Sequence, residues 1–275
     1  MKGLIFAAGL GTRLKPLTDK MPKALVPVCG KPLIQHVAEK LASAGFTDLV
    51  VNVHHLADML EFWCHAAQLQ TDAFTFSISD ERQQLLETGG GIKHAAPLLR
   101  DADRFLIHNV DILSNVDLQA FWQAGEGSEA TLLVSERETQ RYLIFDNDMR
   151  LVGWTNISTG EVKSPFPAVH EAFNPDYVAP VNAVTARISP WEFHFNDHAY
   201  QLLAFAGIHQ MSTSLLPMMD SWPDKFSIID FYLGICDKVV IRGYVQPDLQ
   251  LIDVGKLDTL EKTEEFVIHN LNSGS

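Results

Sequence analysis

The chain has 275 residues, of which 47% are hydrophobic and 20% charged, and its formal net charge at pH 7 is −13. These values are ordinary for a globular protein and exclude a disordered or fibrous chain, and the negative charge argues against nucleic acid or an anionic membrane as a partner. No segment approaches the roughly 20 consecutive apolar residues that cross a bilayer.

The cysteines and the N-terminal apolar run bear on the cellular compartment. Cys29, Cys64 and Cys236 are odd in number and widely spaced, which suits reduced thiols better than disulfides or a zinc site. The apolar run at residues 3–10 is too short for the core of a secretory signal. We therefore expect a cytoplasmic protein.

Positive charge is concentrated near the N-terminus. Residues 1–31 contain six lysines and arginines against one acid, which gives this segment a charge of +5 and leaves −18 on the remainder. A basic patch beside a glycine-rich turn suits a compact polyanion such as a triphosphate. A solvated basic loop is the alternative explanation.

The hydrophobic pattern of the first half predicts strands that alternate with helices. The expected elements are strand 2–8, a long loop at 9–32, helix 33–44 ended by Gly45, strand 49–53, helix 57–68, strand 74–79, helix 90–99, strand 104–109, helix 117–123 and strand 130–134. This alternation predicts an α/β, Rossmann-like, three-layer fold with a mostly parallel central sheet.

The second half shows a weaker pattern. We expect a hairpin of strands 142–146 and 151–155, irregular structure over 156–200, strand 202–208, helices near 212–219 and at 228–235, strand 239–244, a short segment at 250–252 and a last helix from Lys256. No repeat or clean linker divides the chain, so we expect one domain over residues 1–275.

The loop at 9–32 draws attention because loops of this length inside compact domains are usually functional. It begins Ala8-Gly9-Leu10-Gly11-Thr12-Arg13 directly after the first strand, where binding crevices open in parallel sheets. Glycines let backbone N–H groups approach a phosphate, and arginine offers a planar fork to two oxygens. The run is neither a dinucleotide fingerprint nor a Walker A loop, and alone it fits an ordinary turn equally well.

The run continues with Arg13-Leu14-Lys15-Pro16-Leu17-Thr18 and then Met21-Pro22-Lys23-Ala24-Leu25-Val26-Pro27. It resembles, nearly residue for residue, the sugar-1-phosphate nucleotidyltransferase pattern G-x-G-T-R-L-x-P-L-T followed by P-K-x-L-[VL]-P. The resemblance implies transfer of a nucleoside monophosphate from a nucleoside triphosphate to a sugar 1-phosphate, with Mg²⁺ as cofactor. It places the triphosphate on Ala8, Gly9, Gly11, Thr12 and Arg13, and makes Arg13 and Lys23 the catalytic candidates.

A second glycine run, Leu86-Glu87-Thr88-Gly89-Gly90-Gly91-Ile92, lies between a predicted strand and helix. We expect its N–H groups to point outward at the helix start, where a base or ribose lies on them. The resemblance implies nucleotide contacts for Glu87, Thr88 and Gly89, and the run looks most like bacterial N-acetylmuramate-1-phosphate uridylyltransferases and related mannose-1-phosphate guanylyltransferase-like chains. UTP is therefore the expected donor and GTP the alternative. A flexible turn that caps the helix, without any ligand, is the alternative explanation of the glycines.

Two acids are candidates for the metal site. Asp111 closes the predicted strand in Asn109-Val110-Asp111, and Asp253 stands in Leu251-Ile252-Asp253-Val254-Gly255, which resembles the family's W-x-D-[VT]-G with leucine in place of tryptophan. The resemblance implies that both aspartates bind Mg²⁺, a cation held by one or two carboxylates and substrate phosphates, and that Asn109 contacts the nucleotide. A turn or cap role is the alternative for each acid.

The sequence gives the weakest indication for the residues that bind the acceptor. Arg141-Tyr142 resembles the family's R-Y-G, which implies that Tyr142 contacts the sugar, but Leu143 replaces the glycine and no Glu-Lys-Pro triplet follows. Two other functions stay open: transfer to a non-sugar phosphate, and a non-catalytic nucleotide-sensing subunit, which the presence of Lys23 and Asp111 disfavours. The length leaves no room for a C-terminal hexapeptide β-helix, and we expect a monomer or small homo-oligomer.

Overall fold

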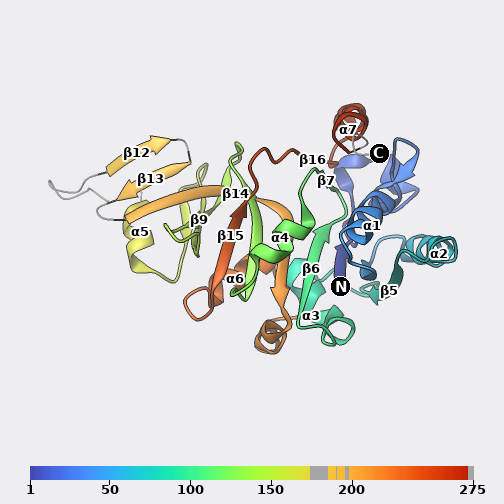
Figure 1. Cartoon of the computed structure of the whole chain (residues 1–275), viewed down its shortest axis with the longest axis horizontal. Helices are drawn as coiled ribbons and strands as arrows, with labels where there is room; N and C mark the ends of the chain where they lie inside the picture. The colour runs from blue at the N-terminus through green and yellow to red at the C-terminus, as the bar shows by residue number, and fades with distance from the viewer. Residues whose placement is uncertain (174–184, 190, 196–197, 272–275) are drawn as a thin grey trace.

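The fold is built on one large mixed sheet, seen in a computed structural model that describes residues 1–173, 185–189, 191–195 and 198–271 (Figure 1). Along its main path the strands lie in the order β11-β10-β9-β14-β6-β1-β4-β5. The first half of the chain forms one end of this path, and the second half forms the other.

The nucleotide-binding end predicted from the sequence is parallel. It contains β1 (Lys2–Phe6), β4 (Asp48–Val53), β5 (Thr75–Asp80) and β6 (Arg104–Asn109), and every pairing among them is parallel. The connections carry the helices α1 (Leu33–Ser43), α2 (Ala57–Gln68) and α3 (Glu87–Leu99). Because these strands run in one direction, their C-terminal ends share one edge of the sheet.

Beyond β6 the sheet becomes largely antiparallel. The long strand β14 (His198–Ser212) lies antiparallel to β6 and also pairs with β8 (Ala130–Ser135), β9 (Arg141–Phe145) and β13 (Glu192–Phe195). The sheet is completed by β10 (Leu151–Asn156), β11 (Glu161–Lys163), β12 (Thr185–Ser189) and β15 (Ile241–Val245).

The stretch at 156–200, predicted to be irregular, contains several of these regular elements. Besides β11, β12 and β13 it holds the short helix α5 (Pro167–Phe173), and β14 begins inside it. Ile144, Val169, Phe195 and Tyr200 form a small separate core there. Residues 174–184, 190 and 196–197 of this stretch lie outside the described part of the chain.

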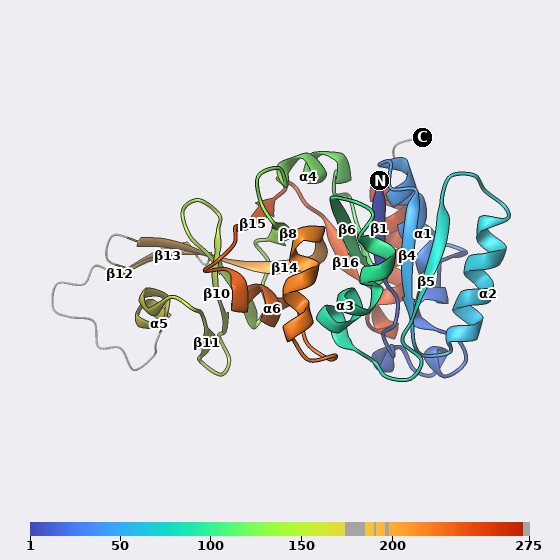
Figure 2. The same ribbon diagram turned by 90° about the horizontal axis from the view of Figure 1, so that it is seen from below.

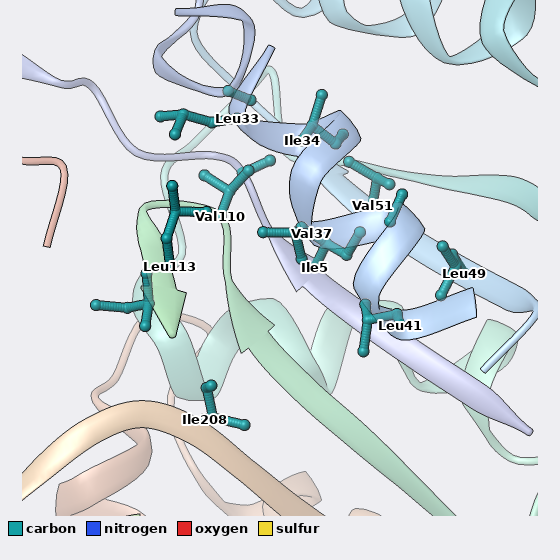
Figure 3. Packing of buried hydrophobic residues seen from close by; sticks show 14 of the residues in the cluster. Ile5, Leu33, Ile34, Val37, Leu41, Leu49, Val51, Val110, Leu113 and Ile208 are labelled. Atoms are coloured by element: carbon teal, nitrogen blue, oxygen red, sulfur yellow. The ribbon is translucent and has the colours of Figure 1, made fainter. Parts of the chain in front are cut away.

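The three layers follow from alternation along the buried strands. In β1, Ile5 belongs to a core that also contains residues of α1, α2, α4 (Leu118–Ala124) and α7 (Leu260–Phe266). Leu4 belongs to a second core that contains residues of α3, α6 (Ile228–Ile235) and the 3₁₀ segment Thr213–Ser221 (Figure 2). Successive strand residues point to opposite faces of the sheet, so a buried strand contributes side chains to both cores. The apolar face of α1 lies on Ile5, Leu49 and Val51 in Figure 3. The three-layer α/β prediction is confirmed.

A small ladder brings the C-terminal part of the chain back to the sheet edge. β7 (Ile112–Ser114) directly follows the end of β6 and pairs antiparallel with β16 (Leu251–Asp253), with Asp253 opposite Ile112. This pairing places residues 253–255 beside the C-terminal end of β6. In the long first loop, β2 (Pro27–Val28) and β3 (Lys31–Pro32) pair, and Thr12–Leu14, Leu17–Asp19 and Lys23–Leu25 form 3₁₀ turns.

Two further findings concern the compartment predictions. Within the described ranges no helix combines the length and the apolar character that spanning a bilayer requires. The three cysteines are all free, Cys64 and Cys236 being buried and Cys29 exposed.

Candidate active site

A cleft of about 440 Å³ opens at the C-terminal ends of the parallel strands. Its walls come from the loop after β1, the first turn after β5, the end of β6 and the segment after β16. The predicted site residues that line it are Ala8, Gly9, Gly11, Thr12, Arg13, Lys23, Glu87, Thr88, Asn109 and Asp111.

The loop after β1 depends on Gly11. Its φ of +61° is strained for any residue with a side chain, and a Cβ there would lie 2.7 Å from Cγ2 of Thr18. The Thr18 hydroxyl also donates a hydrogen bond to the Gly11 carbonyl at 2.9 Å. At Gly9, by contrast, a Cβ would meet no protein atom within 4 Å. Gly11 is therefore required by the loop itself, whereas Gly9 leaves open space on the cleft side.

Lys23 reaches the cleft from a 3₁₀ turn of the same loop. Its ammonium donates to Oδ2 of Asp111 at 2.5 Å, and the two side chains are 10% and 23% exposed. A largely buried cation thus stands at the end of β6, beside the first predicted metal ligand.

The two predicted metal ligands are neighbours. The Val254 N–H donates to the Asp111 carbonyl at 2.8 Å, which fixes Asp253 next to Asp111 along the β7–β16 ladder. A Cβ on Gly255 would lie 2.8 Å from both Oδ1 of Asp253 and Nη2 of Arg13. Gly255 therefore lies between the Arg13 guanidinium and the Asp253 carboxylate. Arg13 and Gly255 line the cleft, whereas Asp253 stands beside Gly255 and is not among the lining residues.

This pair of carboxylates fits Mg²⁺ by its chemistry. Carboxylate oxygens are hard ligands, and Mg²⁺ is usually held by one or two of them together with substrate phosphates and waters. No cluster of three or more His, Cys, Asp or Glu side chains is found among the described residues. Asp111 and Asp253 would therefore suit an ion completed by a bound polyphosphate rather than an all-protein cage.

The second glycine run differs from its prediction. The Gly89 and Gly90 N–H groups do not point outward, because both donate to the Phe226 carbonyl, at 2.8 and 3.2 Å. A Cβ at Gly89 would lie 2.3 Å from the Phe226 ring, and one at Gly90 would lie 2.0 Å from the Asp224 carbonyl oxygen. The glycines let α3 pack against residues 224–226, and Gly89 is not among the residues that line the cleft. Glu87 and Thr88 do line it.

Replacing Gly90 by alanine is expected to lower stability by roughly 2–3 kcal/mol, because overpacking against backbone cannot be relieved by a rotamer change. Thermal denaturation measures this, with an expected fall of about 2–4 °C for each kcal/mol. Gly9→Ala is the matched control, since its new methyl group meets open space. Equal melting temperatures for the two variants would show that the contact between α3 and residues 224–226 is not tight.

Tyr142 does not reach the cleft. It is buried, its hydroxyl accepts a hydrogen bond from the Thr139 N–H at 2.9 Å, and its ring packs on Trp191. Its neighbours Arg141 and Leu143 instead line a second hollow of about 550 Å³, formed with residues of β10, β11, β14 and the start of α6. Tyr142 thus lines neither the cleft nor this hollow, and its contact with the sugar stays a prediction.

Two polar side chains that line the cleft were not predicted. Asn52 at the end of β4 and Glu81 just after β5 are both buried and both line the cleft. Burial raises the pKa of the Glu81 carboxyl above its ordinary value. Their positions in the sequence could have indicated both residues, because each polar residue lies at or just after the end of a predicted strand at the crevice edge.

A sequence profile of the nucleotidyl transferase family matches residues 2–143, more than half of the chain. The chain belongs to this family. The match covers the parallel end of the sheet, Arg13, Lys23 and Asp111, while Asp253 lies beyond it.

Curated members of the family resemble this chain over part of its length. It is 50% identical over 108 residues to the N-acetylmuramate alpha-1-phosphate uridylyltransferase of Caulobacter vibrioides, covering 39% of this chain and 44% of that protein. It is 37% identical over 143 residues to the mannose-1-phosphate guanyltransferase of Hypocrea jecorina, covering 50% of this chain and 38% of that protein. These alignments thus span less than half the length of either relative.

Solved structures share the fold over nearly the whole chain. A putative glucose-1-phosphate thymidylyltransferase from Bacillus anthracis superposes with a TM-score of 0.71 at 15% identity, covering 100% of this chain and 98% of that one. HddC from Yersinia pseudotuberculosis superposes with a TM-score of 0.66 at 21% identity, covering 96% and 98%. At such identities the likeness concerns the fold alone, which these structures share over both the parallel and the antiparallel end of the sheet.

Proposed function

We propose that the chain transfers a nucleoside monophosphate from a nucleoside triphosphate to a sugar 1-phosphate and releases pyrophosphate. The observation that carries this proposal is the convergence of Arg13, Lys23, Asp111 and Gly255 on one cleft, with Asp253 beside them. Two cations and two carboxylates at a glycine-rich loop suit a metal-bound polyphosphate.

The reaction needs little covalent help from the protein. An oxygen of the sugar 1-phosphate attacks the α-phosphorus in line, the bond from that phosphorus to the bridging oxygen of the β-phosphate breaks, and pyrophosphate leaves. The attacking oxygen is already an anion, so no general base is required, and positioning with charge neutralisation lowers the barrier. Arg13 would hold the departing phosphates, and Lys23 would oppose the charge on the α-phosphoryl oxygens.

Asp111 and Asp253 would hold the Mg²⁺. The ion, when bound, supplies positive charge to the phosphates of both substrates. The Lys23–Asp111 ion pair keeps the lysine head at the end of β6, next to where the ion would lie. We extend the proposal to a cytoplasmic location, which the three free cysteines support. A single domain and a monomer or small homo-oligomer complete it.

The second hollow supports an acceptor that carries a further negative charge. Arg137, Arg141 and Lys163 line it, against the acids Glu161 and Asp230. Lys163 pairs with Asp230 at 3.0 Å, and Arg137 donates to the Phe205 carbonyl, while no ion pair is found for Arg141 within the described residues. The hollow adjoins the cleft. Thr88, which lines the cleft, accepts a hydrogen bond from the Ile228 N–H, and the two neighbours of Ile228 in the chain line the hollow.

N-acetylmuramate bears a lactyl carboxylate, whereas mannose is neutral. The cations of the second hollow therefore favour the first acceptor, and with it UTP, the donor named by the uridylyltransferase relatives of Caulobacter vibrioides and Neisseria meningitidis. The alternative is GTP with mannose 1-phosphate, as the name of the Hypocrea jecorina relative suggests.

A substrate matrix tests the proposal. Four nucleoside triphosphates are combined with the 1-phosphates of N-acetylmuramate, N-acetylglucosamine, mannose and glucose, and with phosphocholine, while pyrophosphate release is measured. UTP with N-acetylmuramate 1-phosphate is expected to give the highest kcat/KM, and N-acetylglucosamine 1-phosphate is the matched control that lacks only the lactyl group. A maximum with phosphocholine would move the function to a non-sugar acceptor, and nucleotide binding without any turnover would support a sensing subunit.

A further inference from the structure

Asn52 lies beneath the phosphate-binding loop and holds its first residues. Its Oδ1 accepts hydrogen bonds from the Ala7 N–H at 2.6 Å and the Ala8 N–H at 3.2 Å. The side chain is 3% exposed. These are the two residues that lead from β1 into the loop, so the position of the Asn52 amide sets where the loop departs from the sheet.

Glu81 fixes that amide in turn. Nδ2 of Asn52 donates to Oε1 of Glu81 at 2.8 Å, and Oε2 of Glu81 accepts from the Leu86 N–H at 3.3 Å. Glu81 is also 3% exposed. The same carboxylate therefore bonds the residue under the phosphate loop and the residue that precedes Glu87 and Thr88 on the opposite wall of the cleft.

The pair is closely covered by α3. A Cβ at Gly91 would lie 3.0 Å from Oε1 of Glu81 and 3.3 Å from Nδ2 of Asn52. With so little room, the donor and acceptor roles are fixed: the Asn52 oxygen faces two N–H groups, so its NH₂ must face the carboxylate. A buried polar link is rigid when every group has a partner and costly when one is lost.

We propose that Asn52 and Glu81 are positioning residues that hold the two walls of the nucleotide cleft at a fixed spacing. The inference rests on the proposed function, since it takes the loop at residues 7–13 to bind the triphosphate. The link acts through backbone N–H groups on both walls, so its loss changes how well the triphosphate fits before it changes the fold.

A reciprocal exchange tests the link. Asn52→Asp alone sets a second carboxylate against Glu81, and Glu81→Gln alone leaves an amide that cannot accept from both Asn52 and Leu86. The double variant Asn52→Asp with Glu81→Gln reverses the donor and acceptor between the two side chains. It keeps every bond to Ala7, Ala8 and Leu86 as well as the net charge.

The expected result is a rise in KM for the nucleoside triphosphate of roughly tenfold to a hundredfold in Asn52→Asp, and of roughly three- to tenfold in Glu81→Gln, with recovery to within about threefold of the parent in the double variant. KM for the sugar 1-phosphate should stay unchanged. Ser79→Ala is the matched control: Ser79 is the register partner of Asn52 on β5, and its buried hydroxyl has no partner among the described groups.

A merely structural role would lower the melting temperature and the active fraction but leave KM of the folded protein unchanged, and that outcome overturns the proposal. A double variant no better than Asn52→Asp also overturns it. Should Asn52→Asp fail to fold, the comparison of the double variant with Glu81→Gln carries the same test. If the parent shows no transfer with any substrate, the proposed function fails separately, and nucleotide affinity of the same variants still decides the role of the link.

Discussion

Replacing Lys23 by alanine is expected to reduce kcat by roughly a thousandfold while KM for the nucleoside triphosphate changes little. The lysine head is almost enclosed and sits 2.5 Å from Asp111 at the end of β6. From there it can oppose charge that develops on the transferred phosphoryl group, and loss of one preorganised charge-stabilising group typically costs about 10²–10³ in kcat. Steady-state pyrophosphate release at saturating substrates measures the effect.

The control for this variant is Lys20→Ala in the same loop. Lys20 is exposed and does not line the cleft, so its removal should leave kcat within about twofold of the parent. Lys23→Met keeps the length of the buried side chain, so it removes the charge without leaving a cavity that could prevent folding. Turnover that survives both Lys23 changes would show that the lysine only holds Asp111 in place.

The site residues that the sequence located well share one property: their local pattern fixes their place. An apolar strand followed by a glycine turn places Arg13 at the crevice edge whatever the rest of the chain does. The same holds for Asp111, which lies two residues after an apolar strand that was predicted at 104–109 and is found there. Topology then requires the C-terminal ends of parallel strands to meet, so the cleft itself was predictable.

Other features depend on partners far along the chain. The glycines at 89–91 predict a ligand platform, but the Phe226 carbonyl accepts from the N–H groups of Gly89 and Gly90. Phe226 and Asp224, more than 130 residues away, also fill the space of the side chains that these two glycines lack. Nothing local distinguishes a glycine kept for a ligand from one kept for a helix contact. The Asn52–Glu81 link was missed for the same reason, since each residue alone looks like an ordinary strand end.

In the second half of the chain, hydrophobic periodicity does not predict how the strands pair. β14 runs over residues 198–212, yet its alternation is broken by a register shift between Phe205 and His209, and only 202–208 was expected. One strand that pairs with β6, β8, β9 and β13 has different neighbours along its length, so its burial pattern is not uniform. The antiparallel end of the sheet follows from these pairings, and such long-range pairing leaves no mark in a short window of sequence.

Removing either predicted metal ligand is expected to abolish most of the turnover. Asp111→Asn and Asp253→Asn should each lower kcat/KM by about a thousandfold, because a metal ion at the phosphates contributes several kcal/mol of charge stabilisation. Chelation with EDTA should abolish turnover by the parent protein, and added Mg²⁺ should restore that turnover. Binding of Mn²⁺, followed by electron paramagnetic resonance in the presence of nucleotide, gives a readout that does not depend on activity.

Asp72→Asn is the control, since Asp72 is an exposed acid in the loop before β5 and lies away from the cleft. The decisive comparison is the double variant of Asp111 and Asp253. Asp253 ends β16, and Asp111 directly precedes the partner strand β7. If the two carboxylates hold the same ion, removing the second should cost almost nothing once the first is gone. Additive losses in the double variant would mean that the two aspartates act independently, and the shared magnesium site would have to be given up.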